Sequence, residues 1–330
     1  MEALLFEQAG EAVRCLTCER RCELRPGEQG WCRTRQNLDG RIRTLTWGVV
    51  SSLSADPVEK KPLYHFHPGS AVFTAGSWSC NFSCPWCQNW QISKSQGGPM
   101  AAPVPPGEFV GGAQARGCQG IALSYNEPTL SLEWGCEAFR EALLAGLYTC
   151  IVTNGYMTPM ALELMARNGL QALNVDVKGG PDAVRRHCGA DVECVWRNCA
   201  RALALGLHLE ITTLLVPGVS DSEESISALA GRLRGELGQD VPWHLTAYHP
   251  DWQFTARPTA PETLRRAWHI ARAAGLHYVY TGNMPGDEFG DTFCAGCHAA
   301  VIRRSGFEVV FNGLRSGRCP VCGARVAGVL

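Results

Sequence analysis

The sequence SCNFSCPWC, residues 79–87, brings three cysteines together at Cys80, Cys84 and Cys87. The chain has 17 cysteines among its 330 residues. At that frequency, a triple with this spacing is expected by chance only about 0.04 times. The triple follows residues 71–75, a short apolar run that predicts a β-strand. The loop after this strand is therefore the first candidate for a metal centre.

Further strands are predicted along the rest of the chain. Short apolar runs bounded by turn residues predict these strands: Ala71–Ala75, Gly120–Ser124, Tyr148–Thr153, Ala172–Lys178, His208–Leu215, Trp243–Tyr248 and His277–Thr281. Helical patterns lie between several of them: Leu130–Ala145, Pro159–Asn168, Ser222–Leu237 and Pro261–Ala274. Repeated strand–helix units imply right-handed parallel crossovers. We therefore expect an α/β fold, a partial (β/α)6 TIM-like barrel, in which residues 97–112 form a loop.

Polar clusters follow several of the predicted strands, at residues 125–128, 153–156, 176–179 and 282–286. In a barrel of this type, chemistry collects on the loops after the carboxyl ends of the strands. One shared active face is therefore expected. The barrel is predicted at residues 71–286, between an N-terminal cysteine-rich, metal-binding segment (1–70) and a C-terminal four-cysteine, zinc-ribbon-like segment (287–330).

The composition excludes several classes of protein. Hydrophobic residues make up 45% and charged residues 18% of the chain, a balance typical of globular domains. Thirty Lys and Arg against 31 Asp and Glu leave a net charge of −1, so the basic excess of a nucleic-acid binder is absent. No apolar run approaches the roughly 18 residues of a membrane span, and no signal peptide is recognisable. We therefore expect a cytoplasmic protein whose cysteines stay reduced or bind metal.

The chemistry of the cysteine triple favours iron and sulfide. Three thiolates can hold three irons of a [4Fe–4S] cluster, which usually has four cysteine ligands. One iron then lacks a protein ligand, and an open coordination position is typical of a catalytic centre. Pro85 and Trp86 would stiffen the loop and shield the cluster from water. The alternative is a zinc site with a fourth ligand such as His65 or His67.

The triple, with an aromatic residue before its last cysteine, resembles the signature of radical S-adenosylmethionine (SAM) enzymes. Four other stretches resemble the radical SAM enzyme of the AmmeMemoRadiSam system, a group similar to pyruvate formate-lyase activating enzymes: residues 56–66 (DPVEKKPLYHF), 87–90 (CQNW), 125–129 (YNEPT) and 280–283 (YTGN). The resemblance extends over nearly the whole chain. Ser79 departs from it, because the family usually has glycine there, and a positive φ would strain a serine.

The resemblance implies a radical SAM barrel and its chemistry. The open iron would bind the amino and carboxylate groups of SAM, and one electron from a flavodoxin- or ferredoxin-like donor would cleave the sulfonium C–S bond. The products would be methionine and a 5′-deoxyadenosyl radical, which abstracts hydrogen from a substrate. The activating enzymes suggest a glycine in a partner protein as that substrate. The AmmeMemoRadiSam group implies instead a reaction linked to Memo- and AMMECR-type partner proteins.

Two segments are expected to bind SAM beside the cluster. Residues 125–128 stand where related enzymes have a Gly-Gly-Glu-Pro motif that contacts the SAM amino group. Glu127 is therefore expected to accept hydrogen bonds from that group, with Asn126 assisting. The alternative for Glu127 is a carboxylate at the start of the next helix. Thr153 and Asn154 resemble the ribose-side motif of the family, and the alternative for them is an ordinary Asn-Gly turn.

Asp176 and Lys178 are the candidate catalytic residues. They resemble the Asp-x-Lys segment that lies near SAM and substrate in activating enzymes, and a local ion pair is the alternative. Other polar or aromatic residues are expected to line the cavity and contact the cofactor: Trp86, Glu210, Thr212, His244 and Asn283. The alternative for the polar residues on strands is that they satisfy neighbouring polar groups.

Two four-cysteine groups flank the predicted barrel. Cys294, Cys297, Cys319 and Cys322 form two CxxC knuckles that predict a zinc ribbon. A segment of about 40 residues cannot bury enough core to fold alone, so zinc is expected to stabilise it.

The N-terminal group consists of Cys15, Cys18, Cys22 and Cys32. Its compact spacing predicts a metal, either structural zinc or an auxiliary iron–sulfur cluster. The other six cysteines are expected to pack as small hydrophobic residues: Cys118, Cys136, Cys150, Cys188, Cys194 and Cys199. The alternative for Cys188, Cys194 and Cys199 is another metal cluster, although their spacing has no CxxC knuckle.

Other functions are compatible with the same residues. A non-catalytic metal-binding scaffold would present ribbons at both ends of the chain, and a zinc-dependent hydrolase would use the Cys80 triple. For the radical SAM function, both a protein glycine and a small molecule stay open as the substrate.

Overall fold

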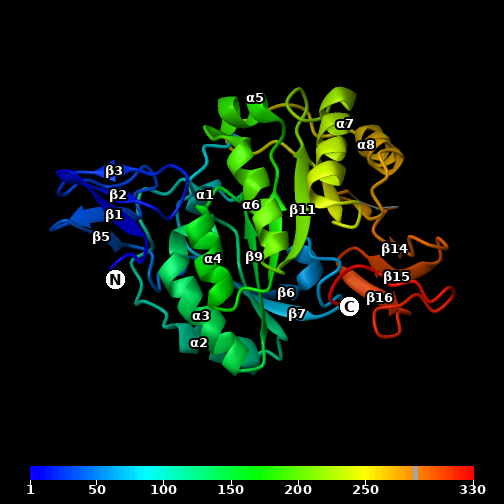
Figure 1. Ribbon diagram of the computed structural model, residues 1–330, viewed down its shortest axis with the longest axis horizontal. Coiled ribbons are helices and arrows are strands. Elements are labelled where there is room, and N and C mark those ends of the chain that lie inside the picture. The colour runs from blue at the N-terminus through cyan, green and yellow to red at the C-terminus, as the bar shows by residue number, and fades with distance from the viewer. Residues whose placement is uncertain (285–288) are drawn as a thin grey trace.

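The protein is built around one open sheet of eight strands, shown in Figure 1. The computed structural model describes residues 1–284 and 289–330. Seven strands run parallel in chain order: β7 (Ala71–Gly76), β8 (Gly120–Leu123), β9 (Tyr148–Thr153), β10 (Ala172–Asp176), β11 (His208–Leu215), β12 (Trp243–Ala247) and β13 (Val279–Gly282). The eighth strand, β6 (Ser52–Pro57), pairs antiparallel with β7 at the edge. The predicted α/β partial barrel is therefore confirmed.

All seven predicted strands form, but the sheet begins earlier in the chain than expected. The strand β6 has no apolar run, because its residues alternate between exposed and half-buried positions at the sheet edge. Its pairing with β7 attaches residues 52–57 to the barrel, although they lie inside the segment 1–70 that was expected to form the cysteine-rich extension. Residues Pro285 and Gly286 of the predicted 282–286 turn lie outside the described residues.

Helices cover the sheet between its strands. They are α1 (Trp90–Ser93), α2 (Pro106–Ala115), α3 (Leu132–Leu144), α4 (Pro159–Arg167), α5 (Pro181–Ala183), α6 (Val192–Ala204), α7 (Glu223–Arg232) and α8 (Pro261–Ala273). Two 3-10 segments, η1 (Val58–Lys60) and η2 (Pro128–Ser131), and two π-helical segments, η3 (Val184–Cys188) and η4 (Leu233–Leu237), accompany them. The prediction of a loop over 97–112 is wrong from residue 106 onward. Pro106 occupies the first helical turn of α2, where its missing N–H costs nothing. Burial of Phe109 and Val110 then outweighs the poor helix propensity of its glycines.

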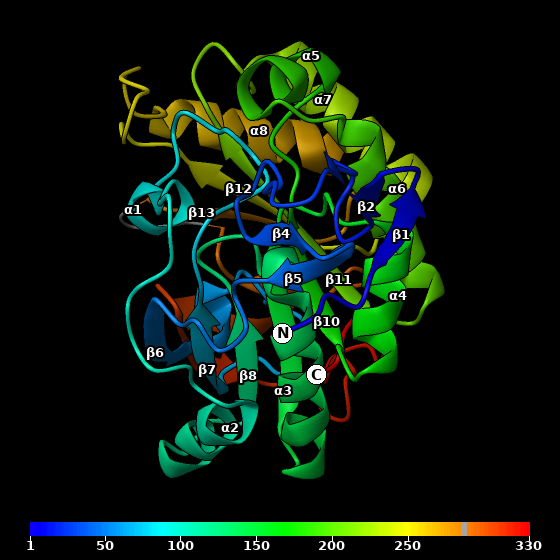
Figure 2. The same cartoon turned by 90° about the vertical axis from the view of Figure 1, so that its left-hand side faces the viewer.

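Two small β lobes flank the barrel on opposite sides (Figures 1 and 2). The N-terminal lobe contains the sheet β1 (Phe6–Ala9), β2 (Ala12–Cys15) and β3 (Glu23–Leu24), and the hairpin β4 (Arg35–Leu38) and β5 (Arg41–Thr44). The C-terminal lobe contains β14 (Thr292–Phe293), β15 (Ala300–Ser305) and β16 (Glu308–Asn312). Each lobe carries one of the four-cysteine groups.

The largest hydrophobic core lies between the helices and the barrel sheet. Its largest fully buried side chains include Trp196 on α6 and Trp243 on β12. Within the described part of the chain, no helix is both long and apolar enough to cross a membrane.

Candidate functional site

A cavity of about 1050 Å³ opens at the carboxyl ends of the parallel strands. Its lining includes these predicted site residues: Cys80, Cys84, Trp86, Cys87, Asn126, Glu127, Thr153, Asn154, Asp176, Lys178, Thr212 and Asn283. They come from loops or strand ends that are distant in sequence but adjacent in the sheet. Parallel pairing brings them together; for example, Asp176 at the end of β10 lies opposite Thr212 of β11. We call this cavity the mouth of the barrel.

The three cysteines lie in a loop that leaves β7. The Cys80 sulfur accepts a hydrogen bond from the Phe82 N–H at 3.4 Å and another from Asn154 Nδ2 at 3.7 Å. Burial raises the pKa of the Cys80 thiol to about 12. The Cys84 sulfur lies 3.4 Å from the sulfur of Cys188, and this contact, together with burial, raises the pKa of the Cys84 thiol. Thiols of this kind are deprotonated when they bind metal.

Trp86, between Cys84 and Cys87, supplies a test of whether a cluster fits. Its side chain is buried against His187 and Phe254, yet its indole Nε1–H has no hydrogen-bond partner. A buried donor without an acceptor is costly, and sulfur atoms of an iron–sulfur cluster accept such hydrogen bonds. Three cysteines with an unpaired donor beside them fit a [4Fe–4S] cluster.

Asn126 holds the backbone that leads into the Cys80 loop. Its Oδ1 accepts a hydrogen bond from the Ser77 N–H at 2.8 Å, and its Nδ2 donates to the carbonyls of Trp78 and Ser79 at 3.1 and 3.0 Å. Ser79 has a φ of +67°, so the position where the family usually has glycine does require the left-handed region. The Ser79 hydroxyl donates to the Cys32 carbonyl at 2.7 Å, which ties the strained residue to the N-terminal lobe.

Glu127 is buried, and its carboxylate bonds only to neighbouring groups of the protein. It caps η2 by accepting from the Thr129 N–H at 3.0 Å, and it also accepts from the Thr153 hydroxyl at 2.7 Å and the Asn154 N–H at 2.9 Å. Burial raises the pKa of Glu127. Glu127 therefore caps the start of a helical segment, which was the alternative role considered for it. Its expected contact with the SAM amino group stays a prediction.

Thr153 and Asn154 follow β9 and are held by the same network. Asn154 Nδ2 donates to Asn81 Oδ1 at 2.7 Å, and Asn154 Oδ1 accepts from the Tyr156 N–H at 2.9 Å. The Thr153 hydroxyl also accepts from the Gly155 N–H at 3.1 Å. Thr153 and Asn154 therefore line the cavity, as predicted, and also form the local turn that was the alternative.

Asp176 and Lys178 form an ion pair at the mouth, with 2.9 Å between Asp176 Oδ2 and Lys178 Nζ. Their side chains are 26% and 19% exposed, so both remain accessible from the cavity. Burial lowers the pKa of Lys178, but the Asp176 carboxylate and the Cys84 sulfur outweigh it, and the net pKa is raised. Lys178 is therefore a stable cation here and does not release its proton near neutral pH.

Two further predicted residues reach the mouth from later strands. The Thr212 hydroxyl donates to Asn174 Oδ1 at 2.8 Å, and Asn283 Nδ2 donates to the Ala247 carbonyl at 3.3 Å. Asn283 has a φ of +61°, a conformation that asparagine tolerates better than most residues. Thr246 lines the cavity beside them.

Glu210 and His244 do not line the mouth, contrary to expectation. Glu210 lies two residues before Thr212 on β11, and His244 lies two residues before Thr246 on β12, so each points to the same side of the sheet but lies deeper than the residue of its own strand that lines the mouth. Glu210 accepts from His244 Nε2 at 2.6 Å, from His208 Nε2 at 2.9 Å, and from the N–H groups of residues 64 and 65. All its acceptor positions are used within the protein, so Glu210 joins strands in this structure, and its expected contact with the cofactor stays a prediction.

His65 belongs to this deeper layer as well. Its Nδ1 donates to the Ala327 carbonyl at 2.6 Å and its Nε2 accepts from the Tyr280 hydroxyl at 2.5 Å. His67 stacks on Tyr148. Neither histidine lines the mouth, so the structure offers neither as the fourth ligand of a zinc ion at Cys80.

Sequence reasoning missed Lys94 and Cys188. Lys94 lines the mouth and its Nζ donates to the Phe82 carbonyl at 2.6 Å, which fixes the Cys80 loop from the side of α1. Cys188 was expected to fill space, with a further cysteine cluster as the alternative, and contact with Cys84 was not foreseen. Neither residue has a motif in the sequence, because their positions depend on loop packing.

Comparison with known proteins identifies the family. Residues 79–230 match the Radical SAM superfamily. Over 336 aligned positions the chain is 37% identical to the uncharacterized protein MJ0808 of Methanocaldococcus jannaschii, covering 100% of this chain and 99% of that protein. The chain belongs to the radical SAM superfamily. It is a radical SAM enzyme, whose family cofactors are a [4Fe–4S] cluster and SAM.

More distant similarities concern part of the chain. The isethionate sulfite-lyase activating enzyme of Oleidesulfovibrio alaskensis is 30% identical over 138 residues, which cover 41% of this chain and 43% of that enzyme. Two solved structures share the fold with a TM-score of 0.53: a radical SAM methyltransferase from Sphaerobacter thermophilus and SuiB from Streptococcus suis bound to SAM. The first is 19% identical over 67% of this chain and 68% of its own; the second is 13% identical over 69% and 53%.

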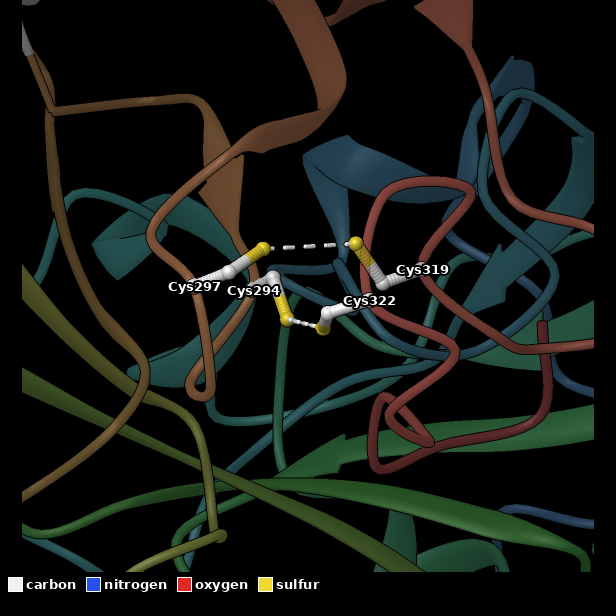
Figure 3. A group of neighbouring side chains, drawn as sticks. All are labelled: Cys294, Cys297, Cys319 and Cys322. Atoms are coloured by element: carbon white, nitrogen blue, oxygen red, sulfur yellow. Dashed lines mark hydrogen bonds between the residues drawn. The ribbon is translucent and has the colours of Figure 1, made fainter.

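The C-terminal cysteines of this radical SAM enzyme form a compact group, drawn in Figure 3: Cys294, Cys297, Cys319 and Cys322. Their sulfur atoms lie within 4.8 Å of one another. The Cys294–Cys322 and Cys297–Cys319 sulfur pairs are 3.6 and 3.7 Å apart. Four sulfurs placed tetrahedrally at about 2.3 Å from one zinc ion are about 3.8 Å apart. Hydrogen bonds from the N–H groups of Cys322 and Val321 lower the pKa of Cys319 to about 7. The group can hold one metal ion.

The N-terminal cysteines line a second, smaller cavity of about 320 Å³. Its position beside the Cys80 loop was not predictable, because it depends on how the N-terminal lobe packs on the barrel. The Arg20 guanidinium donates from Nε and Nη2 to the Asn81 carbonyl at 3.0 and 2.9 Å. Together with the Ser79–Cys32 hydrogen bond, this contact joins the lobe to the loop that carries Cys80, Cys84 and Cys87.

Proposed function

We propose that the mouth of the barrel is the active site and that Cys80, Cys84 and Cys87 are the protein ligands of the [4Fe–4S] cluster. The observation that carries the proposal is the convergence of the three cysteines with Asp176 and Lys178 on one open cavity. When bound and reduced, the cluster supplies the electron that cleaves the sulfonium C–S bond of SAM. A reducing cytoplasm fits this chemistry, since thiols stay reduced there.

The polar residues at the mouth then divide into two groups. Asn126 bonds to the backbone that leads into the cysteine loop, and Asn154 bonds to the side chains of Cys80 and Asn81, so both position the loop, while Glu127 holds Asn154 through its N–H. Asp176 and Lys178 present a hydrogen-bond acceptor and a donor to the cavity side by side. These are the two groups that recognise the N–H and C=O of a peptide backbone.

A peptide glycine in a partner protein is the proposed substrate. The partial match to an activating enzyme supports it, and so do the hydrogen-bond acceptor and donor that Asp176 and Lys178 place side by side at the mouth. One hydrogen atom would pass from the glycine Cα to the 5′ carbon of the adenosyl group, leaving the unpaired electron on the glycine. Memo- and AMMECR-type proteins are the proposed partners, and a flavodoxin- or ferredoxin-like protein is the proposed electron donor.

The test is anaerobic turnover with SAM, a chemical reductant and glycine peptides deuterated at Cα. We expect 5′-deoxyadenosine that carries deuterium by mass spectrometry, and the same assay is run with purified Memo- and AMMECR-type proteins. Cys84→Ala should form no product, whereas Cys150→Ala, which alters a buried thiol within β9 that does not line the mouth, should keep it. An intact cluster without product would favour the scaffold function, and colourless, iron-free active protein would favour the zinc hydrolase.

We also propose that the C-terminal group holds structural zinc. The tetrahedral sulfur spacing supports this assignment. Cys294→Ala/Cys297→Ala should lose one zinc per chain while the iron content stays constant. Loss of iron instead of zinc in this variant would contradict it.

A further inference from the structure

The N-terminal cavity contains more than its four sulfurs. Its lining includes Cys15, Cys18, Cys22 and Cys32, three of them buried, together with the polar side chains of Thr17 and Arg35. Backbone N–H groups already point at two of the sulfurs, from Trp31 to Cys22 at 3.5 Å and from Arg20 to Cys18. Such contacts are typical of thiolates that bind a metal centre.

Arg35 and Thr17 each have a buried polar atom without a partner. The Arg35 side chain is 2% exposed; its Nη1 pairs with Glu133 at 2.8 Å and its Nη2 donates to the Leu130 carbonyl at 3.1 Å. Its Nε–H has no acceptor, and neither has the hydroxyl of Thr17. Unsatisfied donors in a buried site are costly. They indicate that the occupant of this cavity accepts hydrogen bonds.

The need for an acceptor distinguishes the two metal centres that the spacing leaves open. A zinc ion with four thiolates brings no acceptor besides the cysteine sulfurs. An iron–sulfur cluster adds inorganic sulfides, which accept hydrogen bonds from nearby donors. The unpaired indole N–H of Trp86 stands in the same relation to the Cys80 triple. Arg20, Arg21 and Arg35 also line the cavity, although Arg21 and Arg35 are already paired with Glu19 and Glu133.

We propose that Cys15, Cys18, Cys22 and Cys32 hold a second [4Fe–4S] cluster, fully ligated by protein and therefore unable to bind SAM. Its ligand loop touches the loop of the first cluster, through Ser79–Cys32 and Arg20–Asn81. The second cluster goes beyond the proposed function and does not depend on the substrate.

The first test removes the catalytic cysteines. The variant Cys80→Ala/Cys84→Ala/Cys87→Ala, reconstituted anaerobically, should retain about four irons and four sulfides per chain. Its reduced form should give an electron paramagnetic resonance signal that does not change when SAM is added. Wild-type protein should contain about eight irons, with a SAM-sensitive and a SAM-insensitive signal. The proposal is overturned if the variant contains no iron, whether the N-terminal group then holds zinc or no metal.

The second test compares single substitutions in that variant. Cys22→Ser should lose about one iron or change the cluster signal, whereas Cys118→Ser, at a buried cysteine away from the cavity, should keep both. Thr17→Val removes a hydroxyl at nearly constant volume and should lower the reduction potential of the remaining cluster. Identical iron content and signal in Cys22→Ser and Cys118→Ser would overturn the assignment.

The two proposals fail separately. Wild-type protein that forms no 5′-deoxyadenosine, while the triple variant keeps its iron, would contradict the proposed function and leave the second cluster in place. Wild-type protein that turns SAM over while the triple variant lacks iron would do the reverse.

Discussion

The mouth and the deep layer of the barrel are built on the same strands, yet they use polar residues in opposite ways. At the mouth, Asp176 and Lys178 stay partly exposed to a cavity. One layer deeper, Glu210 is fully enclosed and bonded to His208, His244 and two backbone N–H groups. The mouth therefore leaves polar groups available for a ligand. In the deep layer, the acceptor positions of Glu210 are all occupied by protein groups, which stabilises the fold.

The deep layer also attaches the C-terminal lobe. His65 bonds to Ala327, Tyr280 bonds to Thr292 at 2.8 Å, and Arg304 Nη2 donates to the Tyr64 carbonyl at 2.8 Å. A residue that lies two positions earlier on a strand thus contributes to stability, while its neighbour on the same face contributes to the site. The predictions below separate these two contributions.

The largest effect is expected for Glu210→Gln. The amide keeps the shape but carries N–H groups where the carboxylate accepts hydrogen bonds, so buried donors would face each other. We expect a loss of about 2–5 kcal/mol in the free energy of unfolding, measured by urea denaturation. Glu262→Gln, at a 77%-exposed side chain on α8, is the control and should change by less than about 0.5 kcal/mol. If Glu210→Gln weakened SAM binding at unchanged stability, Glu210 would belong to the mouth after all.

Stability should fall with acid because of His65. Burial lowers the pKa of His65 to about 4, below the value of about 6.5 in an unfolded chain. The unfolded chain therefore binds a proton first, and stability is lost as the pH falls from about 6.5 towards 4, by about 3 kcal/mol. His65→Asn cannot titrate and should flatten this part of the pH profile. The control His249→Asn, at an exposed histidine, should keep the slope, and equal slopes in the two variants would contradict the assignment.

Asp176→Asn should act on the reaction more than on stability. The change removes the charge that holds Lys178 Nζ at 2.9 Å, and we expect SAM cleavage to slow by about tenfold to a hundredfold. Because the pair is partly exposed, the unfolding free energy should change by less than about 1 kcal/mol. Asp182→Asn breaks an exposed pair with Arg185 and serves as the control. A similar rate in both variants would remove Asp176 from the site.

The smallest effect is expected at Ser79. Ser79→Gly relieves about 1–2 kcal/mol of strain at a φ of +67° but loses the hydrogen bond to the Cys32 carbonyl, about 1 kcal/mol. The two terms nearly cancel, so stability should stay within about 1 kcal/mol of wild type. Ser79→Ala loses the bond and keeps the strain, and should be about 1 kcal/mol less stable. Equal losses in the two variants would mean that the backbone there is not strained.

Much of the fold was predictable because parallel strands buried on both faces leave apolar runs in the sequence. All seven such runs became strands, whereas the edge strand β6 was missed because it has no such run. The helix α2 was missed because glycines and prolines surround its buried residues. At the site, the cysteine triple was evident from spacing, but the depth of Glu210 was not, since alternation along a strand gives the face of a residue and not its layer.

The sequence by itself determined the repeated strand–helix architecture, the three cysteines at the end of β7 and the two four-cysteine groups, because hydrophobic period and ligand spacing are local properties of the chain. Only the tertiary structure decided which polar residues meet. Asn126 and Asn154 hold the cysteine loop, Glu210 and His244 join strands beneath it, and the N-terminal lobe contacts that loop. These partners are brought together by strand pairing and lobe packing across long sequence separations, which no local pattern records.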